Sequence, residues 1–360
     1  MECAWKQNWA TAQRHFTDWW HHAGLVLVIN GVIAADRPHE DVPDPGDAPD
    51  IEAFYTRPEW RARWNHHRLS RQQFLLDSIP ISSTDIGPGS LALFLGGEAR
   101  LAEDTVWFLP SIDPEAPENS PPLRFDPECR WWKITEATLR ACAALARGKY
   151  LVGCPDLIEN VDIVAALRDP QLLLMDMVER PTWVQEKVAE VNQAFFEAYQ
   201  RVYDIIKLPD GSSTFGAFLL WAPGKMAKVQ CDTSAMFSRR MFSSFVTPAL
   251  TAQCEWLDYS MFHLDGHQCI PHLDLLLEIE PLDAIEWTPD PQVPGGGDPV
   301  WYPMYRKILN AGKSVQAIGV RPDQVEPLLD AVGGKGLYVM TSAADLDEAE
   351  RLLKISEPYR

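Results

Sequence analysis

The 360-residue sequence has no long apolar run and few cations for its length. A transmembrane helix needs about 20 consecutive apolar residues, and no segment approaches that length. The 32 Lys and Arg residues are outnumbered by 51 Asp and Glu, which gives a formal net charge of −19. Because an acidic surface repels phosphate backbones and anionic lipids, we expect neither a nucleic acid nor a membrane as a partner.

Other common signatures are missing as well. The seven cysteines are an odd number and none forms a CxxC pair, which is typical of a reducing cytosol rather than of a disulfide framework. The first 20 residues mix Trp with charges, so we expect no secretory signal peptide and a cytoplasmic protein. No GxGxxG follows the first apolar run and no GxxxxGK[ST] occurs, so dinucleotide-binding and P-loop folds lose their main support.

What the sequence does contain is a regular alternation of short apolar runs and amphipathic stretches. Such repeated strand–helix units with continuously apolar strands predict a parallel sheet. About eight units in a chain of this length favour a closed (β/α)8 TIM barrel over an open sheet. The expected strands are residues 25–30, 80–85, 150–153, 218–222, 226–231, 258–263, 284–287, 315–320 and 337–340.

The remaining segments complete the domain plan. Residues 2–22 have Trp and Phe at helical spacing, which predicts an amphipathic helix packed on the barrel. We therefore divide the chain into this N-terminal helix, residues 1–22, and a single barrel domain, residues 23–360. Two Pro-rich segments, 36–50 and 107–123, are expected to be loop insertions, and 59–79 is expected to be helical.

In parallel barrels the reacting groups lie where the strands end, and this sequence places many polar residues there. The set contains several acids and few cations, which suits a metal site or a carboxylate cluster that shares protons. The candidates for contacting a small-molecule substrate are Asn30, Arg37, Asp85, Asp156, Trp287 and Gln316.

The clearest local pattern is His263-Leu-Asp265 at the end of one expected strand. The strand period of two places both side chains on the same face, so they form a two-ligand arm for Zn²⁺ or a similar ion. Cys231 or Asp232, at the end of a neighbouring strand, would add a third ligand. The alternative is a hydrogen-bonded His–Asp pair that binds no metal.

Glu286 ends a further expected strand and is followed by an aromatic residue. A carboxylate in that place can act as a general acid or base with a raised pKa. An ion pair with a cation inside the barrel is the equally weighted alternative. We expect the catalytic groups to be Asp232, His263 and Glu286.

Several segments resemble one known family. They are Cys231-Asp-Thr-Ser-Ala-Met-Phe-Ser-Arg-Arg-Met-Phe-Ser-Ser-Phe-Val-Thr-Pro, Leu257-Asp-Tyr-Ser-Met-Phe-His-Leu-Asp-Gly, Leu282-Asp-Ala-Ile-Glu-Trp-Thr-Pro and Gly87-Pro-Gly-Ser-Leu-Ala, with the closing Leu-Tyr-Val-Met-Thr-Ser. Their order and form are similar to the uroporphyrinogen decarboxylase superfamily, of which this chain looks like a divergent member. The resemblance implies a (β/α)8 barrel with its site at the C-terminal mouth.

That superfamily includes cofactor-free decarboxylases and zinc-dependent methyltransferases that act with corrinoid proteins. In the methyltransferases a His-x-Cys pair and a late Cys hold zinc. By resemblance His263 takes the place of the His, Asp265 stands where the Cys would be, and residues 338–342 contain no Cys. The resemblance then implies an oxygen-rich site of His263, Asp265 and either Glu286 or Cys231.

We therefore expect a metal-assisted methyltransferase that acts with a thiol acceptor or with a corrinoid carried by a partner protein. One alternative is a metal-free decarboxylase or lyase on a small carboxylated substrate, and another is a non-catalytic ligand-binding homologue. True porphyrinogen decarboxylation is ranked low, because the family's R-Q-A-G-R-Y motif is absent and the first strand leads only to Arg37. A homodimer is compatible with the sequence, which fixes neither the substrate nor the oligomeric state.

Overall fold

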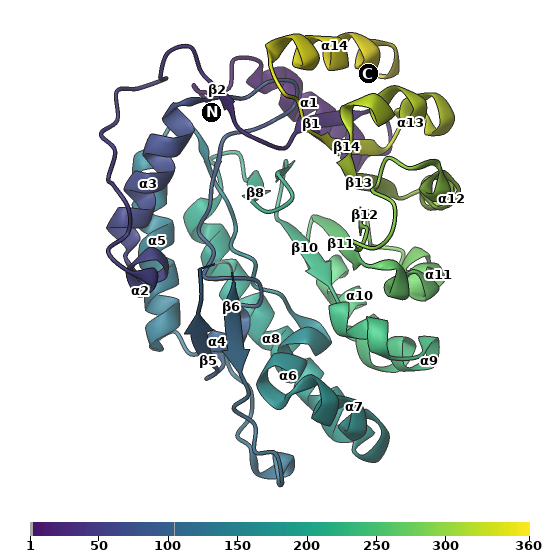
Figure 1. The fold of residues 1–360 in the computed structure, drawn as a ribbon. Coiled ribbons are helices and arrows are strands. Elements are labelled where there is room, and N and C mark those ends of the chain that lie inside the picture. Colours follow the sequence, from purple (N-terminus) through teal and green to yellow (C-terminus); the bar gives the residue numbers. More distant parts are fainter. Residues whose placement is uncertain (1–2, 104) are drawn as a thin grey trace.

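The computed structural model describes residues 3–103 and 105–360. Its largest sheet has six parallel strands drawn from both ends of the chain (Figure 1). In spatial order the strands are β1 (Val26–Ile29), β14 (Leu337–Thr341), β13 (Ser314–Val320), β12 (Ala284–Thr288), β11 (Tyr259–Asp265) and β10 (Met226–Gln230). Nearly all of their residues are buried, as in a sheet covered on both faces. The predicted strands at these positions are confirmed.

A second parallel ladder pairs β4 (Ile81–Ser82) with β7 (Leu151–Val152). Within the described residues no ladder joins this pair to the six-stranded sheet, so the fold is a mixed α/β fold around a central parallel sheet. Isolated hydrogen bonds cross the two gaps. At the first gap they include the Ile29 N–H to Ser78 Oγ at 2.9 Å, and at the second the Cys154 N–H to Thr214 O at 2.8 Å. The hairpin of β8 (Ser213–Phe215) and β9 (Leu220–Ala222) lies at the second gap.

Helices follow the strands and lie on the outer side of the sheet (Figure 1). Those of the second half are α9 (Arg239–Met241), α10 (Thr247–Trp256), α11 (Leu273–Leu277), α12 (Tyr302–Asn310), α13 (Val325–Val332) and α14 (Leu346–Ser356). Those of the first half are α2 (Ile51–Thr56), α3 (Pro58–Ser70), α4 (Leu91–Phe94), α5 (Arg130–Ala146), α6 (Asn160–Arg168), α7 (Pro170–Glu179) and α8 (Pro181–Ile206). Among the described residues, none of these helices combines the length and apolarity needed to cross a bilayer.

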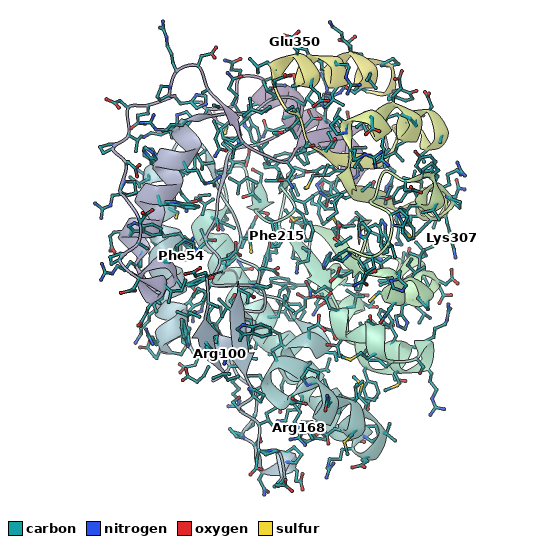
Figure 2. All side chains as sticks on the ribbon, viewed as in Figure 1. Phe54, Arg100, Arg168, Phe215, Lys307 and Glu350 are labelled. Carbon is teal, nitrogen blue, oxygen red and sulfur yellow. The ribbon has the colours of Figure 1, made fainter. Side chains whose placement is uncertain are left out.

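The predicted N-terminal amphipathic helix is present as α1 (Trp9–Trp20). Its buried face packs on the β8–β9 hairpin, where the Trp20 indole N–H donates to Trp221 O at 2.9 Å. Phe16 makes edge contacts with the rings of Trp221 and Tyr338. One hydrophobic core runs from this helix to α14, and Figure 2 shows Phe215 near its middle with Lys307 and Glu350 at the periphery.

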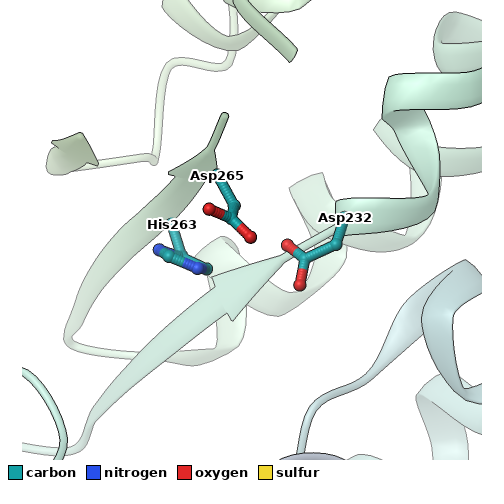
Figure 3. A group of neighbouring side chains, drawn as sticks. All are labelled: Asp232, His263 and Asp265. Atoms are coloured by element: carbon teal, nitrogen blue, oxygen red, sulfur yellow. The ribbon is translucent and has the colours of Figure 1, made fainter. Parts of the chain in front are cut away.

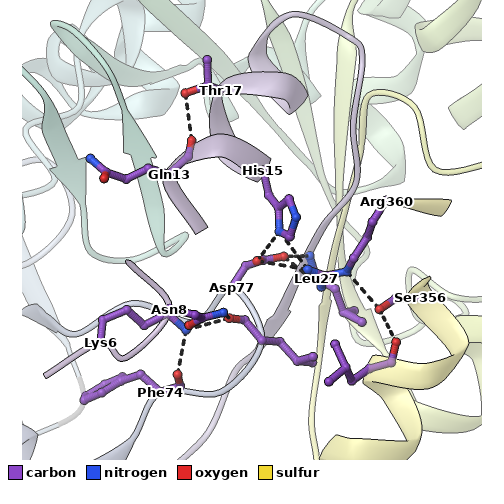
Figure 4. Close-up of polar contacts among 12 residues, drawn as sticks. Lys6, Asn8, Gln13, His15, Thr17, Leu27, Phe74, Asp77, Ser356 and Arg360 are labelled. Carbon is purple, nitrogen blue, oxygen red and sulfur yellow. Dashed lines mark hydrogen bonds and ion pairs between the residues drawn. The ribbon is translucent and has the colours of Figure 1, made fainter. Parts of the chain in front are cut away.

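A buried polar network fastens α1 to the sheet and to the C-terminus (Figure 4). Asp77 is fully buried, and its carboxylate oxygens lie 2.7 Å from His15 Nδ1 and 3.1 Å from Arg360 Nη2. The same carboxylate accepts a hydrogen bond from the Leu27 N–H at 2.9 Å. This network therefore lies beside the beginning of β1 and compensates its own charge.

Two expectations about local structure were wrong. The helix expected at 59–79 ends at Ser70, because the next residues form β3 (Gln72–Gln73), which pairs with β2 (Ile33–Ala34). The apolar residues after position 73 imitate a helical pattern, but they are buried in a non-helical segment. The loop expected at 107–123 begins with β6 (Val106–Leu109), which pairs with β5 (Glu98–Leu101) in an antiparallel hairpin.

Candidate functional site

Three side chains converge where β10 and β11 end (Figure 3). His263 and Asp265 lie on β11, and Asp232 opens the short helical turn that follows β10. One possible ligand atom from each of the three lies within 4.8 Å of the others. His263 and Asp265 point to the same side, as the strand period of two requires. The strand ends thus offer one imidazole and two carboxylates to a common point.

The imidazole of His263 is held in place by Glu286 on the adjacent strand. The two residues are register partners, and His263 Nδ1 contacts Glu286 Oε2. Glu286 is fully buried, and its other oxygen accepts a hydrogen bond from Thr288 Oγ1 at 2.7 Å. The ring of Phe218 packs on the imidazole at 4.9 Å between centroids. This arrangement fixes the ring orientation and leaves Nε2 for another partner, as carboxylate–histidine pairs do at metal sites.

The electrostatics of this group reflect burial and crowded carboxylates. Burial, followed by the charge of Asp162, raises the pKa of Asp232 to about 7. Burial acts to lower the pKa of His263, but Glu286, through its charge and its hydrogen bond, and Asp232 raise it above its ordinary value. Asp232 Oδ2 accepts a hydrogen bond from Gln230 Nε2 at 2.7 Å, whereas Asp232 Oδ1 is buried with no hydrogen-bond partner among the described residues.

Asp162 holds the turn that carries Asp232, and no local motif predicts this contact. One Asp162 oxygen accepts the Asp232 N–H at 2.8 Å, and the other accepts the N–H and the hydroxyl of Thr233 at 2.9 and 2.6 Å. Asp162 lies in the first turn of α6, which is far from β10 in the sequence. Only the folded chain brings the two segments together.

A chain of polar contacts connects Asp232 with Asp85. The Asp156 N–H donates to Asp85 Oδ1 at 2.6 Å, and Asp156 Oδ1 lies 2.7 Å from Lys228 Nζ. Lys228 in turn contacts Gln230 Oε1, and Gln230 donates to Asp232. A lysine inside an apolar strand, Lys228, is the one local sequence signal for this group. Asp85 and Asp156 thus belong to one connected polar network with the Asp232 cluster.

Four other candidates lie elsewhere. Cys231 is not brought to the cluster, because it is 1% exposed in the apolar core and burial raises the pKa of its thiol well above the ordinary value. Trp287 is fully buried against Trp301, since the residue after an inward Glu286 points to the helix layer. Gln316 is also buried, and its amide donates to Phe218 O at 3.0 Å. Arg37 lines a separate surface hollow of about 560 Å³.

Asn30 and Asp85 line a cavity of about 300 Å³ next to the ends of β1 and β4. Burial, with a further contribution from the Asp156 charge against several hydrogen bonds, raises the pKa of Asp85 to about 6. The tip of the β8–β9 hairpin also contributes to the cavity, where Leu219 has a φ of +51°. A left-handed leucine is uncommon, and such strain is found at sites where a loop must keep a defined shape.

No family profile and no curated protein matches the sequence. Among solved structures, a methyltransferase from Methanosarcina mazei is similar, with a TM-score of 0.63 over 97% of this chain and 98% of that chain. The two sequences are 9% identical, so the likeness establishes a shared fold and no more.

Proposed function

We propose that this protein is a metal-assisted methyltransferase whose site consists of Asp232, His263 and Asp265. The observation that carries the proposal is the approach of these three ligand atoms to within 4.8 Å at the strand ends. The full-length likeness to a methyltransferase supports it. We also infer that the two parallel ladders are arcs of one (β/α)8 barrel, because such a barrel places its reacting groups at this edge.

The residues fit a divalent cation. The buried Asp232 Oδ1 has no hydrogen-bond partner among the described residues, which is the expected state of an oxygen that awaits a ligand. Glu286 holds the imidazole so that Nε2 remains available. One nitrogen and two oxygens suit Zn²⁺ as well as Mn²⁺ or Fe²⁺, and the absence of thiolate favours a less zinc-selective site.

In this proposal a bound cation would supply Lewis acidity that lowers the pKa of a thiol acceptor. The thiol proton passes to solvent water, the thiolate sulfur forms a bond to the methyl carbon, and the bond from that carbon to the donor breaks with its electron pair remaining on the donor. Glu286 keeps the His263 proton on Nδ1, and Phe218 excludes water from one face of the imidazole. A corrinoid on a partner protein is the proposed methyl donor.

The test combines metal content with activity. We expect one equivalent of metal in the purified protein, loss of that metal in His263→Ala, and thiol-dependent demethylation of methylcobalamin by the wild type but not by His263→Ala. His267→Ala is the matched control, since His267 lies in the following turn, is half exposed and contacts Asp290 instead. Metal-free protein, or a His263→Ala variant that keeps metal and turnover, would end the proposal.

A metal-free lyase or decarboxylase is the second candidate. The contact between His263 and the buried Glu286 favours it, because such a pair can hold and deliver a proton without any metal. Turnover that persists in chelator and incorporates solvent deuterium at carbon would select this function over methyl transfer.

A further inference from the structure

The cavity beside β1 and β4 contains a cation without a counter-ion. Arg68 of α3 lines it and is partly exposed, and among the described residues no carboxylate forms an ion pair with its guanidinium. Its buried Nε has no hydrogen-bond partner, and the guanidinium lies over the ring of Trp64 at 5.1 Å. Burial and the neighbouring cation Arg61 both lower the pKa of Arg68. Because the guanidinium is only partly open to solvent, an anion beside it would stabilise its charge.

A second donor in the same cavity is also unused. Gln72 is 6% exposed, and its Nε2 has no acceptor among the described residues. Its backbone carbonyl is already used, because it accepts a hydrogen bond from His39 Nε2 at 2.8 Å. Water can satisfy an amide, but it cannot neutralise a guanidinium. Two adjacent elements, α3 and β3, therefore each contribute a residue with an unsatisfied donor to the lining of one cavity.

The other residues that line the cavity determine the size and polarity of the ligand that fits it. The cavity measures about 300 Å³, which is at the small end for ligand sites. Ile29, Ile33, Leu69 and Ile79 contribute apolar wall, and Asp85 brings a negative group to the same space. A doubly charged phosphate would meet that carboxylate, whereas a single carboxylate is balanced by Arg68 alone.

We propose that this cavity binds a small apolar molecule through one carboxylate, which accepts hydrogen bonds from Arg68 and Gln72. The inference does not rest on the proposed metal chemistry, because no residue of the Asp232, His263 and Asp265 group lines the cavity. It identifies a recognition site for carboxylate-bearing ligands, whichever reaction the strand ends perform.

The experiment is a calorimetric titration of chelator-treated full-length protein with butanoate, hexanoate and phenylacetate, each paired with its amide. We expect at least one acid to bind at least about tenfold more tightly than its amide, since a hydrogen bond to a charged group is worth roughly that factor. Arg68→Met should abolish this preference, and Gln72→Leu should weaken the acid severalfold. Failure of all three acids to bind, or equal binding of acid and amide, would overturn the proposal.

Two controls keep the result interpretable. Arg63 lies on the exposed face of the same helix, so Arg63→Gln should leave acid binding unchanged. Without ligand, Arg68→Met should melt at the same temperature as the wild type or higher, because it removes an uncompensated charge. A clear loss of thermal stability in Arg68→Met would show that Arg68 has a structural role beyond its stacking on Trp64 and would contradict the inference. His263→Ala should bind the acids like the wild type, which separates this site from the metal proposal.

Discussion

Buried charged groups are paired near the beginning of the central strands, whereas several near the strand ends have atoms without partners among the described residues. Near the beginning of β1, Asp77 meets His15, Arg360 and a backbone N–H, so its charge and its lone pairs are used inside the chain. Near the strand ends, Asp232 Oδ1 and the Arg68 Nε have no hydrogen-bond partner among the described residues. The first arrangement explains stability, and the second is expected where a protein keeps groups free for ligands.

The largest effect should come from breaking the compensated network. Asp77→Ala leaves His15 and Arg360 without their shared carboxylate, and we expect the free energy of unfolding to fall by about 3–5 kcal/mol in urea denaturation. Asp323→Asn is the control, because it removes an exposed partner of Arg321 and should leave unfolding unchanged. An Asp77 variant as stable as the control would contradict the claim that the paired charges near the beginning of β1 stabilise the fold.

Removing a buried carboxylate near the strand ends should stabilise the protein, whereas removing Asp77 should destabilise it. Glu159 allows a test by pH. Glu159 is fully buried, one of its oxygens has no hydrogen-bond partner among the described residues, and burial raises its pKa from 4.5 to about 8. Because the folded pKa is the higher one, stability from the neutral acid is complete below pH 4.5 and is lost as pH rises through about 8.

The free energy of unfolding of the wild type should therefore fall by about 3 kcal/mol from pH 5 to pH 8, relative to that of Glu159→Gln, which does not titrate at this position. The glutamine can still accept the Gln230 N–H, which Glu159 Oε1 accepts at 2.6 Å. Thermal unfolding of both proteins at several pH values measures the effect. Parallel pH profiles for the two proteins would mean that Glu159 is ionised in the folded state.

A smaller effect is expected from Glu286, whose carboxylate is hydrogen-bonded and holds the imidazole of His263 in place. Glu286→Gln keeps a hydrogen-bond acceptor for His263 but removes the charge that orients the imidazole. We expect metal affinity to fall by about 10- to 100-fold while the fold is retained. Competition with a chromophoric chelator measures the affinity, and circular dichroism monitors the fold. An unchanged metal affinity would show that Glu286 does not position His263 for metal binding.

The sequence was sufficient for the strands of the six-stranded sheet and for the relative placement of two candidate residues. Short β-branched runs such as 25–30 favour buried strands, and the period of two correctly placed His263 and Asp265 on one side. The same period would have excluded Trp287 once Glu286 faced inward. The choice between Cys231 and Asp232 needed the register in which Gln230 pairs with His263, and register is not encoded locally.

What could not be predicted depends on distant segments. Asp162 reaches Asp232 across 70 positions, and Lys228 becomes informative only beside Asp156. Arg68 looks like an ordinary polar residue of a helix until the structure shows that no carboxylate accompanies it. The hairpin of β5 and β6 was missed because its strands are only four residues long, and the end of β6 falls within the Pro-rich segment that was expected to be a loop.

The most direct test of the central claim is a crystal structure of protein loaded with Zn²⁺ or Mn²⁺, measured at the absorption edge of the metal. The account predicts one anomalous peak between Asp232, His263 and Asp265, about 2.0–2.2 Å from His263 Nε2 and from one oxygen of each carboxylate. A loaded protein with no peak there, or with its peak at another group of residues, would contradict it.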